Sequence, residues 1–268
     1  MTNKKLVRTI EELEDAFIDA IVKSAGKISK KSSGLVRILD IASGDNKSLS
    51  PLINGLVEKS IDYEIVLLDT APYHLHDGYN RLKENIPPKE LENIRCVLSD
   101  AANLRKKINK FMAYIWPDDL REIDDIIEID MYRFLKQFYR NGDWNVKFED
   151  ESFDIVMGNY AYRSIENYPA AARECARVLK KGGYHIFREF EIEDINGASP
   201  RSEEAMRRMN EFNELKIIQE TKRVLDPIMD PITILSTRII YPHENPPNKN
   251  NPAQVGDIIR ESVLIYQK

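Results

Sequence analysis

Cysteine and histidine are scarce in this sequence of 268 residues. The two cysteines, Cys96 and Cys175, lie in segments of apolar pattern and are too few for a disulfide framework, so we expect the chain to fold in a reducing compartment. His74 and His76 form only a short pair, and His185 falls within an apolar run. Because no cluster of His and Cys has the spacing of metal ligands, the sequence predicts no metal site.

An excess of basic residues is also missing. The chain has 39 Lys and Arg residues against 44 Asp and Glu residues, which gives a formal net charge of -5. An acidic chain has no overall attraction to a phosphate backbone, and the basic run at residues 105–110 is more typical of a solvated helix face. Nucleic acid is therefore not the expected partner.

Long apolar runs are absent as well, and no stretch could span a bilayer. The first residues, MTNKKLVRTIEELEDAF, lack the apolar region of a signal peptide and are too acidic for a transit peptide. Hydrophobic residues make up 42% of the chain and charged residues 31%, which is the balance of a globular protein with a full core. We expect a cytoplasmic protein without membrane contact, whose oligomeric state the sequence leaves open.

Residues 1–34 are expected to form a helical extension in front of one larger domain, 35–268. Apolar side chains recur at spacings of three and four between residues 9 and 28, and Thr9 with Glu12 makes a capping box at the start. Two roles fit this amphipathic helix: packing against the domain edge, which we slightly favour, or covering a ligand.

Short β-branched and apolar runs predict buried strands that alternate with helices. The predicted strands are residues 35–41, 64–69, 94–98, 153–157 and a strand that starts at 184–187. The predicted helices are one that Ser50 caps and that has Pro51 in its first turn, one around 79–82 and one over 169–179. Such alternation implies parallel pairing through right-handed crossovers, so the predicted fold class is α/β, a doubly wound Rossmann-like sheet.

The last third of the chain changes character. Residues 215–224, 233–241 and 262–266 are predicted as strands with hairpin-type or loop connections, so the sheet is expected to end with antiparallel members. Residues 105–147 form an insertion rich in aromatics at helical spacing, which either covers a ligand or packs as a small satellite core. The Pro- and Asn-rich stretch 242–252 is predicted to be an exposed loop.

Acidic residues stand at the ends of the first three predicted strands. In a doubly wound sheet a ligand lies outside the carboxyl ends of the strands, where the strand order reverses. Asp40 is followed by a loop whose Gly44 lets backbone approach a ligand, Asp69 is suited to accept both hydroxyls of a ribose, and Asp100 to accept from an adenine amino group. Each alone is equally typical of a turn, but the three together indicate a nucleoside site.

The sequence resembles the class I S-adenosylmethionine (SAM)-dependent methyltransferases over essentially all of residues 36–268. The resembling stretches are VRILDIASGDN, YEIVLLDTAPY, CVLSDAANL, KFEDESFDIVMGNYAYRSI and YPAAARECARVLKKGGYHIFRE. The last two are the most specific, because they occur in this family in that order and spacing. The resemblance implies a seven-stranded sheet of order 3-2-1-4-5-7-6 with strand 7 antiparallel, which we place at 262–267.

The resemblance also implies which residues hold SAM, with S-adenosylhomocysteine as the product. The amino-acid part of the cofactor is expected on Asp40, Ala42, Ser43 and Gly44. The ribose is expected on Asp69, and the adenine on Asp100 and Ala101. The methyl-bearing sulfur is expected beside Gly158, Asn159 and Tyr160. The first loop departs from the family pattern, since Ala42 and Asn46 stand where glycines are usual, and the insertion 105–147 interrupts the usual run between the adenine and sulfur segments.

Methyl transfer from a sulfonium is an in-line displacement, which requires alignment and exclusion of water and no metal. An acceptor that must lose a proton also needs a general base near the end of the fourth or fifth strand. The candidates there are Tyr160, Tyr162, Arg163 and Glu189. Tyr162 would orient the acceptor, Arg163 would pair with an anionic one, and Glu189 would take a proton or hold an amine. Each is equally compatible with a structural role.

The acidic net charge favours a small molecule as the methyl acceptor. Alternatives are a methyltransferase acting on RNA or protein, and a non-catalytic module of the same fold that binds a partner through the insertion. An aminopropyl transferase is less favoured because its acidic acceptor motif is not recognised here. A nicotinamide dehydrogenase would carry G-x-G-x-x-G after the first strand, where this chain has Ala-Ser-Gly-Asp-Asn.

Overall fold

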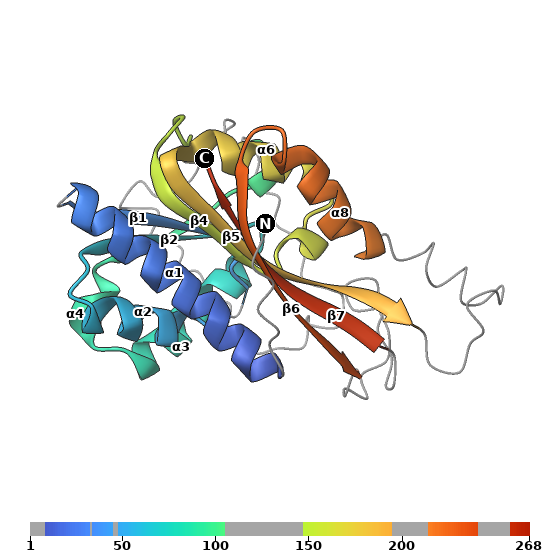
Figure 1. Cartoon of the computed structure of the whole chain (residues 1–268). Helices are drawn as coiled ribbons and strands as arrows, with labels where there is room; N and C mark the ends of the chain where they lie inside the picture. The colour runs from blue at the N-terminus through green and yellow to red at the C-terminus, as the bar shows by residue number, and fades with distance from the viewer. Residues whose placement is uncertain (1–8, 33, 45–47, 105–146, 195–213, 241–257) are drawn as a thin grey trace.

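A computed structural model describes residues 9–32, 34–44, 48–104, 147–194, 214–240 and 258–268 (Figure 1). Three sequence predictions lie essentially outside the described residues: the insertion 105–147, the basic run within it and the loop 242–252. Asn46 in the first loop lies outside them too.

One seven-stranded sheet with the order β3-β2-β1-β4-β5-β7-β6 forms the centre of the fold. Its strands are β1 (Val36–Ile41), β2 (Tyr63–Asp69), β3 (Ile94–Leu98), β4 (Phe153–Asn159), β5 (Leu179–Asp194), β6 (Asp230–Ile240) and β7 (Ile258–Gln267). The first five pair in parallel, whereas β7 runs antiparallel to both β5 and β6. The predicted fold class and strand order are confirmed.

Helices cover both faces of the sheet (Figure 1). They are α1 (Ile10–Ser32), α2 (Leu49–Glu58), α3 (Pro72–Asn85), α4 (Pro88–Leu91), α6 (Tyr168–Val178) and α8 (Glu214–Leu225), with short 3-10 turns η1 (Ala101–Asn103) and η3 (Tyr162–Ser164). Apolar side chains of α1, α2 and α3 form one core with one sheet face, and those of α6, α8 and η1 form a second core with the other face. Burial from both sides explains why the central strands are almost continuously apolar.

The N-terminal helix α1 is part of the main core. The backbone N–H of Glu12 donates to Thr9 Oγ1 at 3.1 Å, as the capping motif predicts. Leu13, Phe17 and Ile21 are fully buried, and they pack with α2 and the sheet in one cluster. The helix continues four residues beyond the predicted end at residue 28, with basic side chains in its last turn, where they complement the helix dipole.

The strand predicted at 215–224 is wrong, because this segment forms helix α8. Its buried residues are Ile217, Ile218, Thr221 and Leu225. The spacings between successive members are one, three and four residues, which is the pattern of one helix face. The prediction gave too much weight to the β-branched pair Ile217 and Ile218. The strand predicted at 233–241 is found as β6.

The predicted start of the second helix is also wrong by two residues. Helix α2 begins at Leu49 with Ser48 at its N-cap position, so Ser50 and Pro51 lie inside the first turn. Ser48 makes no capping hydrogen bond, because its hydroxyl is used by groups outside the helix. One of these groups is the side-chain amide of Asn159, at the carboxyl end of β4.

Candidate active site

The strand order reverses between β1 and β4, which is where a doubly wound sheet opens a crevice for a ligand. Asp40 lies near the carboxyl end of β1 and is only 4% exposed. Its burial, and after that the negative charge of Asp69, raise the pKa of the Asp40 carboxyl well above its usual range. Two acidic groups thus lie close together, and a cationic ligand beside them would favour the ionised form of Asp40.

The loop after β1 has a left-handed backbone at two positions. Gly44 has φ of +55°, and Ala42 has φ of +48° in the region that favours glycine. The loop is held by Ser43 N–H, which donates to Leu68 O at 3.0 Å, and by Gly44 N–H, which donates to Asp69 Oδ2 at 3.1 Å. Ala42 thus adopts the conformation of the glycine that the family pattern has there, at the expense of some backbone strain.

Asp69 joins the ends of β1 and β2. Its Oδ2 accepts from Gly44 N–H, and its Oδ1 accepts from Ala71 N–H at 2.8 Å. His74 of α3 adds a ring nitrogen 3.4 Å from Oδ1. Each carboxylate oxygen has two lone pairs, so Oδ2, with one donor, keeps capacity to accept a hydroxyl, while a hydroxyl at Oδ1 would lie beside His74. The carboxylate is thus oriented by two backbone groups and remains able to accept from a ligand.

Asp100 follows β3 at the neighbouring strand end. The two ends are linked by Ser99 N–H, which donates to Asp69 O at 3.1 Å. Asp100 is exposed, and its Oδ1 accepts from Ala102 N–H at 2.8 Å, which caps η1. Ala101 is buried. The structure brings these predicted adenine residues beside Asp69, while their contact with a base stays a prediction.

At the end of β4, Gly158 and Asn159 differ in what they offer. A Cβ at Gly158 would lie 2.9 Å from Ala161 Cβ and 3.2 Å from Ile41 Cγ1, so close packing requires glycine there. Asn159 Nδ2 donates to Ser48 Oγ at 2.8 Å, whereas its Oδ1 is buried with no hydrogen-bond partner among the described residues. Ser43 Oγ is likewise buried without a hydrogen-bond partner among the described residues. Buried polar atoms are normally satisfied, so these two are candidates for contact with a ligand.

Tyr160 is held rigidly next to Asn159. It has φ of +55°, and its backbone N–H donates to Arg188 O at 2.8 Å. Its hydroxyl donates to Glu261, and the guanidinium carbons of Arg163 and Arg188 lie 4.4 and 4.8 Å from its ring centroid. Burial raises the pKa of the Tyr160 hydroxyl, so this group is a neutral donor.

Glu189 and Arg163 form a loosely spaced buried pair. Arg163 Nε lies 3.5 Å from Glu189 Oε2, and its guanidinium carbon lies 3.9 Å from the Phe190 ring centroid. The other carboxylate oxygen of Glu189 accepts from Tyr162 N–H at 2.8 Å. Burial outweighs the attraction of Arg163 and raises the pKa of Glu189 to about 7, so this carboxyl can exchange a proton near neutral pH.

The Tyr162 side chain lies in the core below η3. It is fully buried, and its hydroxyl lies 2.7 Å from His185 Nε2. His185 Nδ1 lies 3.1 Å from Val156 O, which only accepts, so Nδ1 carries the proton and Nε2 accepts from Tyr162. Burial lowers the pKa of His185 to about 4. The described contacts of Tyr162 are structural, and its catalytic role stays a prediction.

Sequence reasoning missed four polar residues around this site. Arg188 of β5 and Glu261 of β7 form a fully buried ion pair, and Glu14 of α1 lies 3.5 Å from Arg188 Nη1. Ser48 Oγ donates to Glu14 Oε1 at 3.0 Å. Charged residues next to apolar ones in these strands are a local signal, but nothing in the sequence shows that Arg188 and Glu261 meet.

Comparisons with known proteins address the family and the fold. A family model described as a methyltransferase domain matches residues 127–187, which include β4, α6 and the first half of β5. A search of solved structures finds the MccD protein at 15% identity and a TM-score of 0.56, covering 94% of this chain and 96% of MccD. The chain has the class I methyltransferase fold. The resemblance drawn from the sequence is therefore confirmed at the level of the fold.

Two further methyltransferase structures share the fold. One is a proposed sarcosine dimethylglycine methyltransferase from Galdieria sulphuraria, at 11% identity and a TM-score of 0.54, covering 95% of this chain and 84% of that one. The other is the DszA carbon methyltransferase, at 13% identity and a TM-score of 0.52, covering 95% of this chain and 54% of that one. No curated protein sequence matches the chain significantly. The chain therefore shares with these methyltransferases a matching segment, residues 127–187, and the fold.

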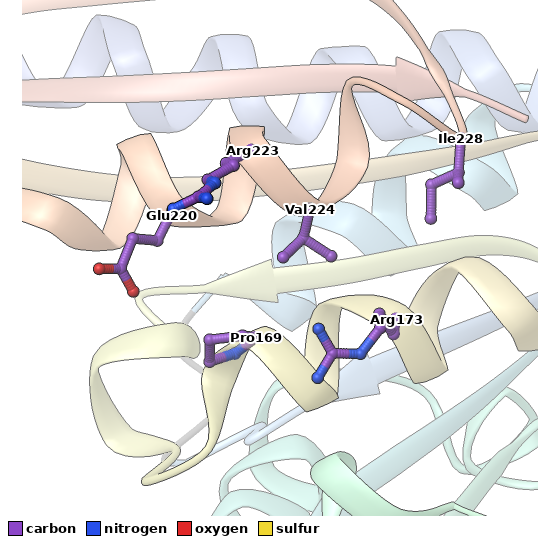
Figure 2. Close-up of a pocket in the computed structure, with 6 residues that line it drawn as sticks. All are labelled: Pro169, Arg173, Glu220, Arg223, Val224 and Ile228. Carbon is purple, nitrogen blue, oxygen red and sulfur yellow. The ribbon is translucent and has the colours of Figure 1, made fainter.

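An open groove of about 500 Å³ lies between α6 and α8, on the sheet face opposite to α1, α2 and α3. Figure 2 shows the residues that line it: Pro169, Arg173, Glu220, Arg223, Val224 and Ile228. None of them is a predicted site residue, and Glu220 accepts from the Tyr168 hydroxyl. The groove is therefore a surface feature separate from the acidic crevice.

Two negative findings apply to the described part of the chain. It contains no group of three or more His, Cys, Asp or Glu side chains that could hold a metal ion. None of its helices is both long and apolar enough to cross a membrane.

Proposed function

We propose that the protein is an enzyme that transfers the methyl group of SAM to a small-molecule acceptor in the cytoplasm. The observation that carries this proposal is the orientation of Asp69, at the carboxyl end of β2 beside the crevice. Two backbone N–H groups orient its carboxylate, and Oδ2, with a single donor, keeps a lone pair that can accept a hydroxyl. Within a class I methyltransferase fold, this arrangement suits the ribose of a nucleoside.

The rest of the crevice fits the cationic and hydroxyl groups of SAM. Besides its carboxylate, the cofactor carries an ammonium, a sulfonium and two ribose hydroxyls, which are cations or hydrogen-bond donors. The residues that can receive these groups are acids or hydrogen-bond acceptors, namely Asp40, Asp69, Ser43 Oγ and Asn159 Oδ1. Acceptors matched to donors in a buried site support SAM over a phosphate-rich dinucleotide, which needs donors instead.

When bound, SAM supplies an activated methyl group, so the residues of the chain mainly orient both reactants and exclude water. The Tyr160 ring, held by a backbone hydrogen bond and by two guanidinium groups, would line the site next to Asn159. Glu189, with its pKa raised to about 7, is the best candidate to hold a proton released by an oxygen or nitrogen acceptor. Arg163 beside it sets how readily that proton is held.

Calorimetry with S-adenosylhomocysteine, SAM and NAD tests the proposal. The native protein should bind both sulfur nucleosides and not NAD. Asp69→Asn should weaken S-adenosylhomocysteine binding by about tenfold, because one charge-assisted acceptor for the ribose is lost. Asp62→Asn is the matched control, since Asp62 lies just before the other end of β2 and is exposed.

The outcomes separate the main alternatives. Equal affinities in native protein and Asp69→Asn would remove Asp69 from the cofactor site. Absence of heat with either sulfur nucleoside, at protein concentrations adequate for micromolar binding, would favour a non-catalytic binding module. Methyl transfer to RNA or protein substrates, but to no small molecule, would overturn the acceptor class alone.

A further inference from the structure

Asn159 carries a side-chain amide at the carboxyl end of β4, and the orientation of that amide decides what it can bind. Its nitrogen donates to Ser48 Oγ at 2.8 Å, and its oxygen is buried without a partner among the described residues. An amide turned the other way would offer two donors to the crevice instead of an acceptor. The chemistry of the cofactor site therefore depends on what fixes this amide.

Ser48 is the group that fixes it. A hydroxyl has one proton, and the Ser48 hydroxyl lies 3.0 Å from Glu14 Oε1. A carboxylate can only accept, so the Ser48 proton must point to Glu14. Ser48 can then only accept from Asn159, and only the amide nitrogen of Asn159 can donate. The oxygen of Asn159 is consequently directed to the opposite side.

Glu14 is itself held in place by its surroundings. Its neighbours Leu13 and Phe17 on α1 are fully buried in the core, so the helix cannot shift without disturbing that core. Its second oxygen lies 3.5 Å from Nη1 of Arg188, whose side chain is 2% exposed and also pairs with Glu261. A buried guanidinium thus keeps the carboxylate facing the Ser48 hydroxyl.

The position of Asn159 indicates which part of the ligand its oxygen receives. In the β1–β4 register Asp40 pairs with Met157, so Asn159 lies alongside the start of the loop after β1. Ser43 Oγ, the other unpartnered acceptor, belongs to that loop. Together with the acidic Asp40, these acceptors suit an ammonium group, such as the one at the amino-acid end of SAM.

We infer that Glu14 is a positioning residue which, through Ser48, turns the Asn159 oxygen toward the ammonium of the cofactor. The N-terminal helix is thereby part of the binding site as well as of the core. This inference rests on the proposed function, because it takes SAM as the ligand.

The substitution Glu14→Gln tests the relay. A glutamine amide can donate to Ser48, which frees the Ser48 proton for Asn159 Oδ1 and lets the Asn159 amide turn over. The probes are S-adenosylhomocysteine and 5′-methylthioadenosine, which lacks the amino-acid part. We expect Glu14→Gln to weaken S-adenosylhomocysteine binding by about fivefold to tenfold and to leave 5′-methylthioadenosine binding unchanged. Ser48→Ala should reproduce this selective loss.

Glu11→Gln serves as the control, because Glu11 is exposed on the same helix and should affect neither probe. Circular dichroism and thermal melting verify that each variant is folded. An equal loss for both probes, or no loss for either, would overturn the inference while native binding of S-adenosylhomocysteine still supports the proposed function. If the native protein binds neither probe, the proposed function itself fails, and the inference falls with it.

Discussion

The two halves of the carboxyl edge of the sheet handle their acidic groups in opposite ways. At β1–β2, Asp69 is met by neutral backbone N–H groups, and Asp40 is buried close to it. At β4–β5–β7, Glu261 and Glu189 each lie against a guanidinium, from Arg188 and Arg163. Among the described residues, no Lys or Arg pairs with Asp40 or Asp69, whereas each glutamate of the second half lies beside an arginine.

This difference separates binding from positioning. A crevice whose acids have no Lys or Arg partner among the described residues gains most from a ligand that brings hydroxyls and positive charge. A half whose charges are paired gains little from a new charge, but its fixed side chains can orient neighbouring groups such as Tyr160 and Asn159. We call the β1–β2 end the acidic half and the β4–β5–β7 end the paired half. Two predictions test the ion pairs of the paired half, and a third tests the strained loop backbone of the acidic half.

The largest effect is expected from Arg188→Met at the paired half. Removing one partner of a buried ion pair leaves Glu261 charged and unpaired, which should lower the free energy of unfolding by about 3–5 kcal/mol. Urea denaturation measures this change. Arg95→Met is the control, because Arg95 pairs with Glu64 at a partly exposed site and should change stability by less than about 1 kcal/mol. Similar losses in both variants would end the distinction between paired and surface charges.

A smaller, pH-dependent effect is expected from Glu189→Gln. Burial raises the pKa of Glu189 from 4.5 to about 7. Between these values the unfolded carboxyl loses its proton while the folded one keeps it, so the native protein loses stability as pH rises from about 4.5 through about 7. Glutamine does not ionise, and the variant should gain up to about 3 kcal/mol relative to native protein over that window.

Urea titrations at several pH values between 4.5 and 8 measure the Glu189 effect. Glu166→Gln provides the comparison, since Glu166 is exposed just beyond η3. A stability difference that stays constant with pH would mean that Arg163 compensates Glu189 fully. In that case the loose 3.5 Å spacing of the pair would have no energetic consequence.

The smallest effect is expected at the acidic half, from Ala42→Gly. Glycine adopts the left-handed region without the clash that Cβ causes, so this change should raise the free energy of unfolding by about 0.5–1 kcal/mol. Ala71→Gly, in the neighbouring loop at φ of -102°, should instead destabilise by a similar amount. Thermal melting of both variants measures the effect, and destabilisation by Ala42→Gly would contradict the strain assigned to this loop.

The sheet could be predicted because its strands carry their own signals. Buried parallel strands are short apolar runs separated by helices, and the family motifs supplied the strand order. Helix α8 was mistaken for a strand because its apolar residues include the adjacent β-branched pair Ile217 and Ile218, and short apolar runs do not reveal their period. The start of α2 was missed because Ser48, which looks unremarkable in sequence, is used by tertiary partners.

The acidic crevice could be predicted for a similar local reason, since Asp40, Asp69 and Asp100 each follow a recognisable strand. The charged cluster at the other half could not. Arg188 and Glu261 are 73 positions apart and meet only because β7 is inserted next to β5. Glu14 reaches Arg188 only because α1 crosses this part of the sheet. Contacts of this kind depend on topology and leave no periodic trace in the sequence.

The inverted order of the last two strands has a consequence for how the protein is made. Strand β6 is synthesised before β7 but pairs within the sheet only with β7, so β6 has no strand to pair with until β7 has left the ribosome. Until then β5 presents an open edge that could pair with another chain. Completion of the sheet, and with it the meeting of Arg188 with Glu261, therefore awaits the last strand to emerge.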